Sequence, residues 1–306
     1  MKLKIWIALL LVYIIWGATY LGIRYAVETI PPFLMAGTRF LVAGTILTIW
    51  RRSAGDPAPT GRQWLRAGLV GLLMLLGGNG LISLAEKTVA SGIAALIVGS
   101  APLWMTAMEA MRPNGARPNW LGLVGLVIGF GGVALLVAPS LLHTAQAVSQ
   151  PIGIVTALFA ALFWSAGSIY SRSAKLPSSS LLSTGMEMLM GGVGLYLAGT
   201  ITGEWHQLVL ANVTTRSWLG LVFLTIFGSM VGFSAYAWLL RNAPVSLVAT
   251  YAYVNPLVAI LLGSLFAQET LTVHILLATL VIIGSVVLIN VARQIKDRGR
   301  PAVAVK

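Results

Sequence analysis

The sequence has no cysteine and little charge. Only 9% of its 306 residues are charged, and no Gly-Lys dipeptide, G-x-S-x-G or H-E-x-x-H motif occurs. The lack of cysteine excludes a disulfide framework, a thiolate nucleophile and a cysteine-based metal site. The missing motifs exclude a Walker A loop and argue against hydrolase and zinc-enzyme sites, and the three histidines are isolated. We therefore expect no metal and no cofactor.

Long apolar runs fill the chain instead. Hydrophobic residues make up 58% of it and the mean hydropathy is +0.88, whereas a soluble domain usually carries about 25% charged residues. A transmembrane helix needs about 20 mostly apolar residues. The sequence therefore predicts an all-α integral membrane protein with ten spans, at 5–27, 31–50, 66–85, 90–111, 119–138, 151–172, 179–200, 217–240, 245–267 and 272–292.

The basic residues sort to one side of this topology. With the N-terminus inside, 16 of the 20 Lys and Arg residues fall on inner segments, three (Arg24, Lys87 and Arg216) fall at outer ends, and Arg39 lies within a span. Such a bias predicts that both termini are cytoplasmic. It also explains the net charge of +12 without nucleic acid as a partner. The last segment, 293–306, is expected to be a basic cytoplasmic tail.

The chain contains an internal repeat. "WGATYLGIR" (16–24) matches "WSAGSIYSR" (164–172) at an offset of 148 residues, and later matches follow at 154. The matched positions include Gly37 and Gly185, Arg39 and Glu187, Gly44 and Gly192, Trp64 and Trp218, and Pro102 and Pro256. The repeat predicts two five-helix halves, 1–138 and 151–292. Because five is odd, the halves insert with opposite orientation, an architecture of secondary transporters whose substrate site lies between the halves.

These features resemble a known family. The segments "YIIWGATYLGIRYAVETIPPFLMAGTRFLVAG", "SGIAALIVGSAPLW" and "ATYAYVNPLVAILLG", the last followed by Glu269, look like the EamA-type branch of the drug/metabolite transporter superfamily. Within it, the chain most resembles the YedA-like drug/metabolite exporters of bacterial inner membranes. The resemblance covers about residues 5–292. It implies ten helices around a central cavity and export of amino acids or other small amphipathic metabolites.

One feature of the wider superfamily is missing. Its small four-helix multidrug exporters use a membrane-embedded Glu in the first helix for proton exchange, but here neither the first nor the sixth span has a carboxylate. Proton antiport cannot be carried over from them. The expected partners are a small-molecule substrate and the lipid bilayer. The coupling proton or ion, the substrate and the choice between monomer and homodimer stay open.

Two opposite charges lie at matched depths in the halves. Arg39 is about mid-depth in the second span, and Glu187 occupies the matched position in the seventh. A charge at that depth is costly and marks a functional site. We predict that the two form a charge pair, directly or through polar neighbours, near the boundary between halves. Three roles stay open: a static brace, gating or binding of an anionic group, and proton coupling through Glu187.

Matched prolines interrupt the fourth and ninth spans. Pro102 and Pro256 each remove a backbone donor, and Ser100 and Asn255 lie beside them. Paired interruptions are a good sequence pointer to a binding site, although a packing kink is the alternative. Aromatic and polar side chains at similar depth complete the candidate cavity lining. These are Trp16, Tyr20, Trp104, Trp164, Tyr251, Tyr253, Asn79 and Ser83.

The favoured function is secondary export of small amphipathic metabolites or drug-like compounds by alternating access. Uptake or exchange of another small metabolite remains open. An intramembrane lipid-modifying enzyme is a weaker alternative, because Glu187 is the one carboxylate deep within a predicted span, whereas Glu109 lies at the end of the fourth. A scaffold or receptor subunit is equally weak.

Overall fold

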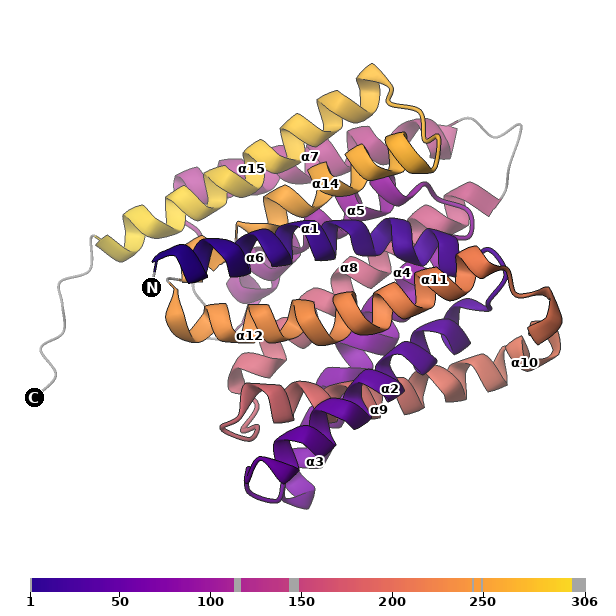
Figure 1. The fold of residues 1–306 in the computed structure, drawn as a ribbon. Coiled ribbons are helices and arrows are strands. Elements are labelled where there is room, and N and C mark those ends of the chain that lie inside the picture. Colours follow the sequence, from indigo (N-terminus) through magenta and orange to yellow (C-terminus); the bar gives the residue numbers. More distant parts are fainter. Residues whose placement is uncertain (1, 113–116, 143–148, 244, 249, 299–306) are drawn as a thin grey trace, which may run out of the picture.

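The computed structural model describes residues 2–112, 117–142, 149–243, 245–248 and 250–298, and within them the chain forms helices and turns but no strand (Figure 1). The first half contains α1 (Lys2–Ala26), α2 (Pro32–Ser53), α3 (Gly61–Gly71), the π-helical η1 (Leu72–Gly80), α4 (Leu81–Ala85), α5 (Ser91–Gly99), α6 (Ala101–Met111) and α7 (Trp120–Leu142).

The second half repeats this order. It contains α8 (Ser149–Ser173), α9 (Ser180–Ile201), the short α10 (Glu204–Gln207) and η2 (Leu210–Asn212), α11 (Thr215–Phe223), the π-helical η3 (Leu224–Val231), α12 (Gly232–Asn242), α13 (Val245–Val248), α14 (Tyr251–Phe266) and α15 (Val273–Arg298). α3, η1 and α4 run on as one rod, as do α11, η3 and α12.

Nine of the described helical rods are long and apolar enough to cross a membrane, and they coincide with nine of the ten predicted spans. The ninth predicted span, 245–267, differs. Its apolar helix α14 has only 16 residues, because it begins at Tyr251, after a turn at Thr250. The end of the last span also differs, since α15 continues to Arg298 into the predicted tail, whose remainder lies outside the described residues.

The same helices of each half pack on their counterparts. α2 packs along α9, and α7 packs along α15. Other contacts occur in matched pairs: α1 packs on α11, α12 and α14, while α8 packs on η1, α4, α5 and α6. Glycines allow the close approach of α2 and α9, since a Cβ on Gly44 would lie 2.9 Å from the Gly185 carbonyl oxygen. Gly125 and Gly129 of α7 likewise face Ser285 of α15.

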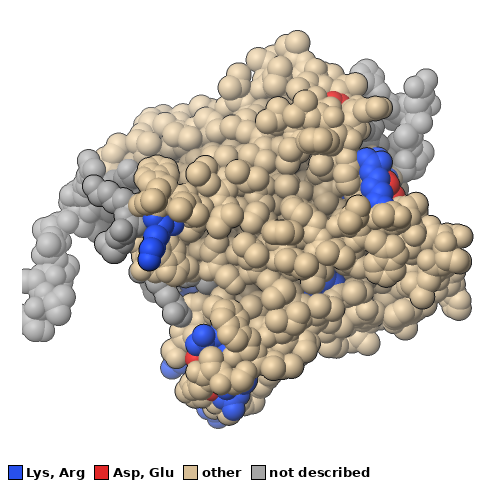
Figure 2. All heavy atoms as spheres, viewed as in Figure 1, with Lys and Arg blue, Asp and Glu red and all other residues tan. Residues whose placement is uncertain are grey.

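The two ends of the bundle differ in charge. We call one the acidic end: it is formed by residues 27–31, 86–90, 202–214 and 267–272 and carries Glu28, Glu86, Glu204 and Glu269. α1 begins and α15 finishes at the opposite, basic end (Figure 1). Figure 2 shows Lys and Arg gathered toward that end and a broad uncharged surface between the ends. Such a band is what lipid tails require.

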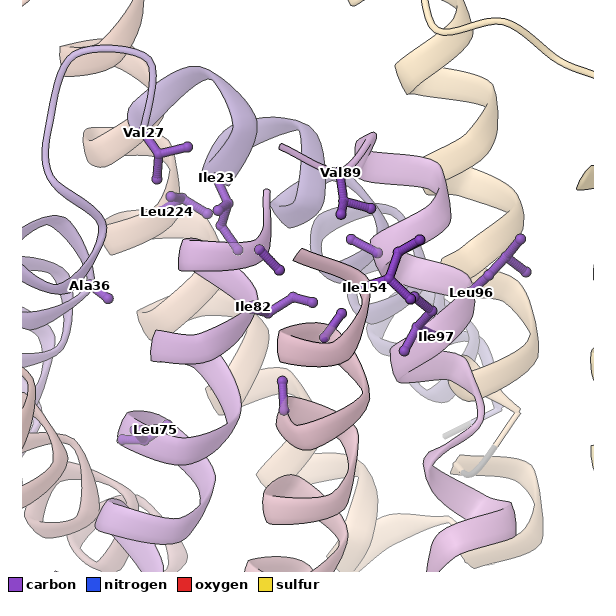
Figure 3. Packing of buried hydrophobic residues seen from close by; sticks show 14 of the residues in the cluster. Ile23, Val27, Ala36, Leu75, Ile82, Val89, Leu96, Ile97, Ile154 and Leu224 are labelled. Atoms are coloured by element: carbon purple, nitrogen blue, oxygen red, sulfur yellow. The ribbon is translucent and has the colours of Figure 1, made fainter. Parts of the chain in front are cut away.

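The acidic end is closed by apolar packing. The closing side chains are each at most 5% exposed and belong to one buried cluster (Figure 3). They are Ile23 of α1, Val27 directly after it, Ile82 of α4, Val89 in the turn before α5, and Ile154 of α8. A carboxylate adds to the closure. Glu204 accepts hydrogen bonds from the backbone N–H groups of Phe33 and Leu34 at 3.2 and 2.9 Å, and so caps α2.

Candidate functional site

A π-helical segment interrupts both the third and the eighth spans. η1 and η3 lie at matched positions of the two halves. π-Helical segments are rare, but a large share of those that occur lie at functional sites. Their wider turn shifts backbone groups out of the regular α-helical hydrogen-bond pattern. Both segments contain small residues, Gly77, Gly78 and Gly80 in η1 and Gly228 and Ser229 in η3. The candidate site lies around these two segments.

The two repeat tryptophans pack against these π-helical rods. Trp16 donates a hydrogen bond from Nε1 to the Gly228 carbonyl oxygen at 3.2 Å, and a Cβ on Gly232 would lie 2.4 Å from that nitrogen. In the other half, Trp164 lies against Gly78, where a Cβ would lie 3.1 Å from its ring. Gly232 and Gly78 are 154 residues apart, the offset of the sequence repeat.

Arg39 reaches the same turn of η3. It is 4% exposed, and its Nε donates a hydrogen bond to the Ser229 hydroxyl at 2.7 Å. A Cβ on Gly228 would lie 3.1 Å from its Nη2, and the guanidinium lies 4.7 Å from the Phe40 ring centroid. Arg39 thus braces α2 against η3 from one side, while Trp16 binds η3 from the other.

An aromatic cluster surrounds Trp16. Its ring lies 5.1 Å from those of Phe233 and Tyr236 and 5.3 Å from that of Tyr251, which joins α1, α12 and α14. Tyr20, one turn further along α1, lies within electrostatic range of Tyr251. The three tyrosines are only half-buried. The cluster can therefore offer apolar ring surface and hydroxyl groups to an amphipathic molecule.

Arg172 links this cluster to α8. Its charge, in the last turn of α8 at the basic end, acts on both Tyr236 and Tyr251. Tyr236 and Tyr251 are also hydrogen-bonded to each other. The phenols of Tyr236 and Tyr251 therefore lie within electrostatic range of the charge at the end of α8.

The fourth span breaks at Ser100, next to Pro102 as predicted. α5 ends at Gly99 and α6 begins at Ala101, with Pro102 in its first turn. Trp104 donates from Nε1 to the Ser100 hydroxyl at 3.2 Å and packs edge-on to Phe130 at 4.8 Å. Ser165 of α8 holds the break by donating to the Ala101 carbonyl oxygen at 3.1 Å.

Pro256 does not break the ninth span. α14 runs through it, and the interruption lies earlier, before Tyr251. The helix tolerates Pro256 because its ring fills the space left by Gly99, where a Cβ would lie 2.8 Å from the proline Cγ. Asn255 is 8% exposed, and with its amide nitrogen toward α1 it donates to the Tyr251 and Tyr13 carbonyl oxygens.

Three further predicted residues lie outside the Trp16 cluster. Ser83 is buried and donates to the Asn79 carbonyl oxygen at 2.8 Å, which ties η1 to α4. Asn79 itself is half-buried in η1. Tyr253 packs against the main apolar core from α14. The structure therefore brings Trp16, Tyr20, Arg39 and Tyr251 together. It places Ser100 and Trp104 at the break of the fourth span, and Trp164 against η1 of the third span.

The predicted direct ion pair between Arg39 and Glu187 is absent from the described structure. Arg39 turns to η3, whereas Glu187 lies where α9 crosses the third span: a Cβ on Gly71 would lie 2.3 Å from its backbone oxygen. Among the described residues, Glu187 has no ion pair or hydrogen bond to its carboxylate. The matched residues instead occupy two matched helix interfaces, α2 with η3 and α9 with α3.

Comparison with known proteins identifies the family. The model of the EamA-like transporter family matches residues 3–138 and again 151–291. The chain belongs to the EamA-like transporter family. It is 38% identical to the inner membrane transporter YedA of Escherichia coli (strain K12), over 97% of this chain and 94% of that protein. It is 26% identical to the transporter YvbV of Bacillus subtilis (strain 168), over 97% and 94%.

A solved structure supports the fold. A crystal structure of a protein with 20% sequence identity matches with a TM-score of 0.64, over 95% of this chain and 98% of that one. With the apolar helices and the relatives of the EamA-like family, these findings make the chain a multi-pass membrane transporter of the bacterial inner membrane. The resemblance predicted from sequence is confirmed.

Several site residues were not predicted. Ser229, Gly228, Tyr236 and Ser165 contact Arg39, Trp16, Tyr251 and the fourth-span break respectively. Small residues within an apolar span are common, so Gly228-Ser229 carried no distinct signal. Tyr236 did carry one, because it is a tyrosine at a span interior close to the other aromatic residues of the second half.

Proposed function

We propose that this transporter exports small amphipathic metabolites, such as amino acids or drug-like compounds, by alternating access between two inverted five-helix repeats. The repeats are residues 1–138 and 151–292, with both termini cytoplasmic and the acidic end external. The matched packing of α2 with α9 and of α7 with α15, and the matched tryptophan–glycine contacts, support this arrangement. Such repeats enclose a substrate site near the midplane.

The aromatic cluster at Trp16 carries the proposal. Trp16, Tyr20, Tyr236 and Tyr251 gather polar and ring surface inside the bundle, and Arg39 contacts the same turn of η3 as Trp16. Sites of this composition suit ligands with one apolar and one polar part. Arg39 provides a positive charge for an anionic group, next to the turn at Gly228 that Trp16 binds. In this proposal, the helix interruptions at Ser100 and at Thr250 are the points about which the helices bend.

The described state is closed at the acidic end. The apolar cluster and the carboxylate caps close the end that we take as external. In the proposed export cycle, this is the state that loads substrate from the cytoplasm. No nucleic acid partner is needed to explain the basic charge. The choice between monomer and homodimer does not enter the mechanism, since the cluster is built from one chain.

Counterflow in proteoliposomes tests the function. Purified protein is reconstituted, the vesicles are loaded with one of a panel of amino acids and cationic drugs, and entry of labelled compound is followed with and without a pH gradient. We expect saturable counterflow of at least one compound, and its loss in Trp16→Ala. Trp120→Ala is the matched control, because Trp120 is 77% exposed at the start of α7. Absence of flux for the whole panel would contradict the proposal.

A further inference from the structure

Glu86 has an unusual environment at the acidic end. It follows α4 directly, it is 0% exposed, and neither carboxylate oxygen receives a hydrogen bond from a described residue. The nearby Ser91 hydroxyl is also buried without a partner among the described residues. Burying an unpaired carboxylate is costly, so such a group usually becomes neutral.

The charges around Glu86 do not compensate it. Arg24 of α1 donates to the backbone carbonyl oxygen of Glu86 rather than to its carboxylate. Tyr20 of α1 lies within electrostatic range. α8 packs against this turn with Gly153, which has no charge to offer. Lys87 is exposed and acts on Glu204 on the α2 side.

The second carboxylate in range is Glu269, which precedes α15. Its two oxygens accept hydrogen bonds from the backbone N–H groups of Ser91 and Gly92 at 2.6 and 3.0 Å. Gly263 leaves room for it, because a Cβ there would lie 2.4 Å from its Oε2. Burial, and then the negative charge of Glu269, raise the pKa of Glu86 well above its usual value, against a smaller opposite effect of Arg24.

A proton suits this site better than a metal ion. Both Glu269 oxygens are already engaged, and the described residues contain no group of three acidic or histidine side chains suited to a metal. Hard cations take about six to eight oxygen ligands. Arg24 would also repel a cation. A small, mostly apolar pocket lined by Gly92, Ile260, Glu269 and Leu271 lies at Glu269.

We propose that Glu86 is a proton-binding site that controls the acidic end: Glu86 holds a proton while that end is closed and releases it when the end opens. In the closed state the neutral carboxyl allows α1, α4 and α5 to pack at Glu269. In the open state Glu86 meets water and ionises, and its repulsion with Glu269 keeps the helix ends apart. The proposal rests on the proposed function only in treating the acidic end as a gate.

Proton linkage fixes the direction of the effect. The open state binds one proton fewer than the closed state, so raising the pH favours opening. At the steep part of the curve the ratio of open to closed states rises by up to about tenfold per pH unit for one proton. Glu86→Gln mimics the protonated carboxyl and removes this dependence.

The experiment needs no substrate. Because the chain has no cysteine, a single Val89→Cys change introduces one thiol beside Glu86, at a position that is 0% exposed. Purified protein in nanodiscs is labelled with a maleimide across a pH series, and each rate is divided by that of Thr270→Cys, an exposed position at the same end. The division removes the intrinsic pH dependence of thiol reactivity.

We expect the normalised labelling rate to rise by up to about tenfold per pH unit, and to stay low and flat when Glu86→Gln is added. In parallel, the infrared difference spectrum between the unaltered chain and Glu86→Gln should show the C=O band of a protonated carboxyl at neutral pH. Glu28→Gln, which removes an exposed carboxylate ion-paired to Arg216 at 3.4 Å, should not show it.

Several results would overturn the proposal. A normalised labelling rate in the Val89→Cys chain that does not change with pH would contradict the gating role, and this measurement does not require Glu86→Gln to fold. An infrared spectrum with Glu86 ionised at neutral pH would contradict proton binding by Glu86. A rate that responds to sodium in place of choline, but not to pH, assigns the site to a cation. None of these measurements depends on counterflow, so an absence of flux for the whole compound panel would contradict the proposed function without affecting them.

Discussion

The two halves of the chain use matched positions in different ways. Arg39 and Glu187 align in the repeat, yet Arg39 binds Ser229 and lies against Gly228, whereas no described residue binds the Glu187 carboxylate. Trp16 donates to the backbone of η3, while Trp164 makes only a packing contact with Gly78. The first half thus forms the braced, polar side of the candidate site. The two halves therefore share matched helices but differ in the side chains that contact the candidate site.

The largest expected effect is at Arg39. Arg39→Ala removes a buried side chain. The Ser229 hydroxyl then loses its hydrogen-bond donor, and the space beside Gly228 is left empty. Loss of a buried polar partner costs about 1–3 kcal/mol, and the emptied volume adds to it, so we expect destabilisation of about 3 kcal/mol and loss of transport. Thermal unfolding in detergent and counterflow measure the two effects.

Arg39→Lys is the matched control. It keeps the charge but loses the planar guanidinium that spans Ser229 and the Phe40 ring. We expect stability between that of the unaltered chain and Arg39→Ala. Equal stability for Arg39→Ala and the unaltered chain would contradict the bracing role.

The next largest effect on stability is expected for alanine substitutions at two matched glycines. Gly232→Ala places a methyl group 2.4 Å from Trp16 Nε1, whereas Gly78→Ala places one 3.1 Å from the Trp164 ring. The first must displace Trp16 and break its hydrogen bond to Gly228, at a cost of about 1–3 kcal/mol typical of overpacking. The second needs a shift of a few tenths of an ångström and should cost less. Unfolding of the two variants side by side checks the order.

Reversal of that order would show that the Trp16 contact is the looser one. A difference in counterflow adds to the test. Since Trp16 belongs to the aromatic cluster, whereas Trp164 packs on η1 outside that cluster, we expect Gly232→Ala to raise the substrate concentration for half-maximal counterflow more than Gly78→Ala does.

The sequence predicted the spans better than it predicted the partners. A run of about 20 apolar residues has one favourable solution in lipid, and nine of the ten predicted spans have a matching helix of full length. The pairing of Arg39 with Glu187 rested on depth alone. Depth does not give the direction in which a helix face points, and matched residues of a repeat naturally face matched neighbours rather than each other.

The remaining features depend on contacts far apart in sequence. Glu204 caps α2 although the bonded residues are 170 positions apart, and Glu269 caps α5 at a separation of 177. No local sequence pattern predicts either contact. The break at Ser100 was predictable because proline acts locally, whereas Pro256 is accommodated by Gly99 on another helix.

The carboxylate caps predict a smaller, shared effect. Glu204→Ala and Glu269→Ala each leave two backbone N–H groups of a first-half helix without their acceptor. Loss of a helix cap costs about 0.5–2 kcal/mol. We expect similar losses in thermal unfolding and additivity in the double variant, because the caps serve different helices. Glu28→Ala, at an exposed ion pair, should cost less than either.

The smallest effect is expected at Glu187, and it decides how the two halves are related. Since no described residue binds its carboxylate, Glu187→Gln should change the unfolding free energy by no more than about 0.5 kcal/mol, as at positions without specific partners. The exchanged variant Arg39→Glu with Glu187→Arg should then be as defective as Arg39→Ala, because Ser229 would face a carboxylate and the new arginine would lie at the α9–α3 interface. Restored counterflow in the exchanged variant would instead show that the two charges meet during the transport cycle, in a conformation other than the closed one described above.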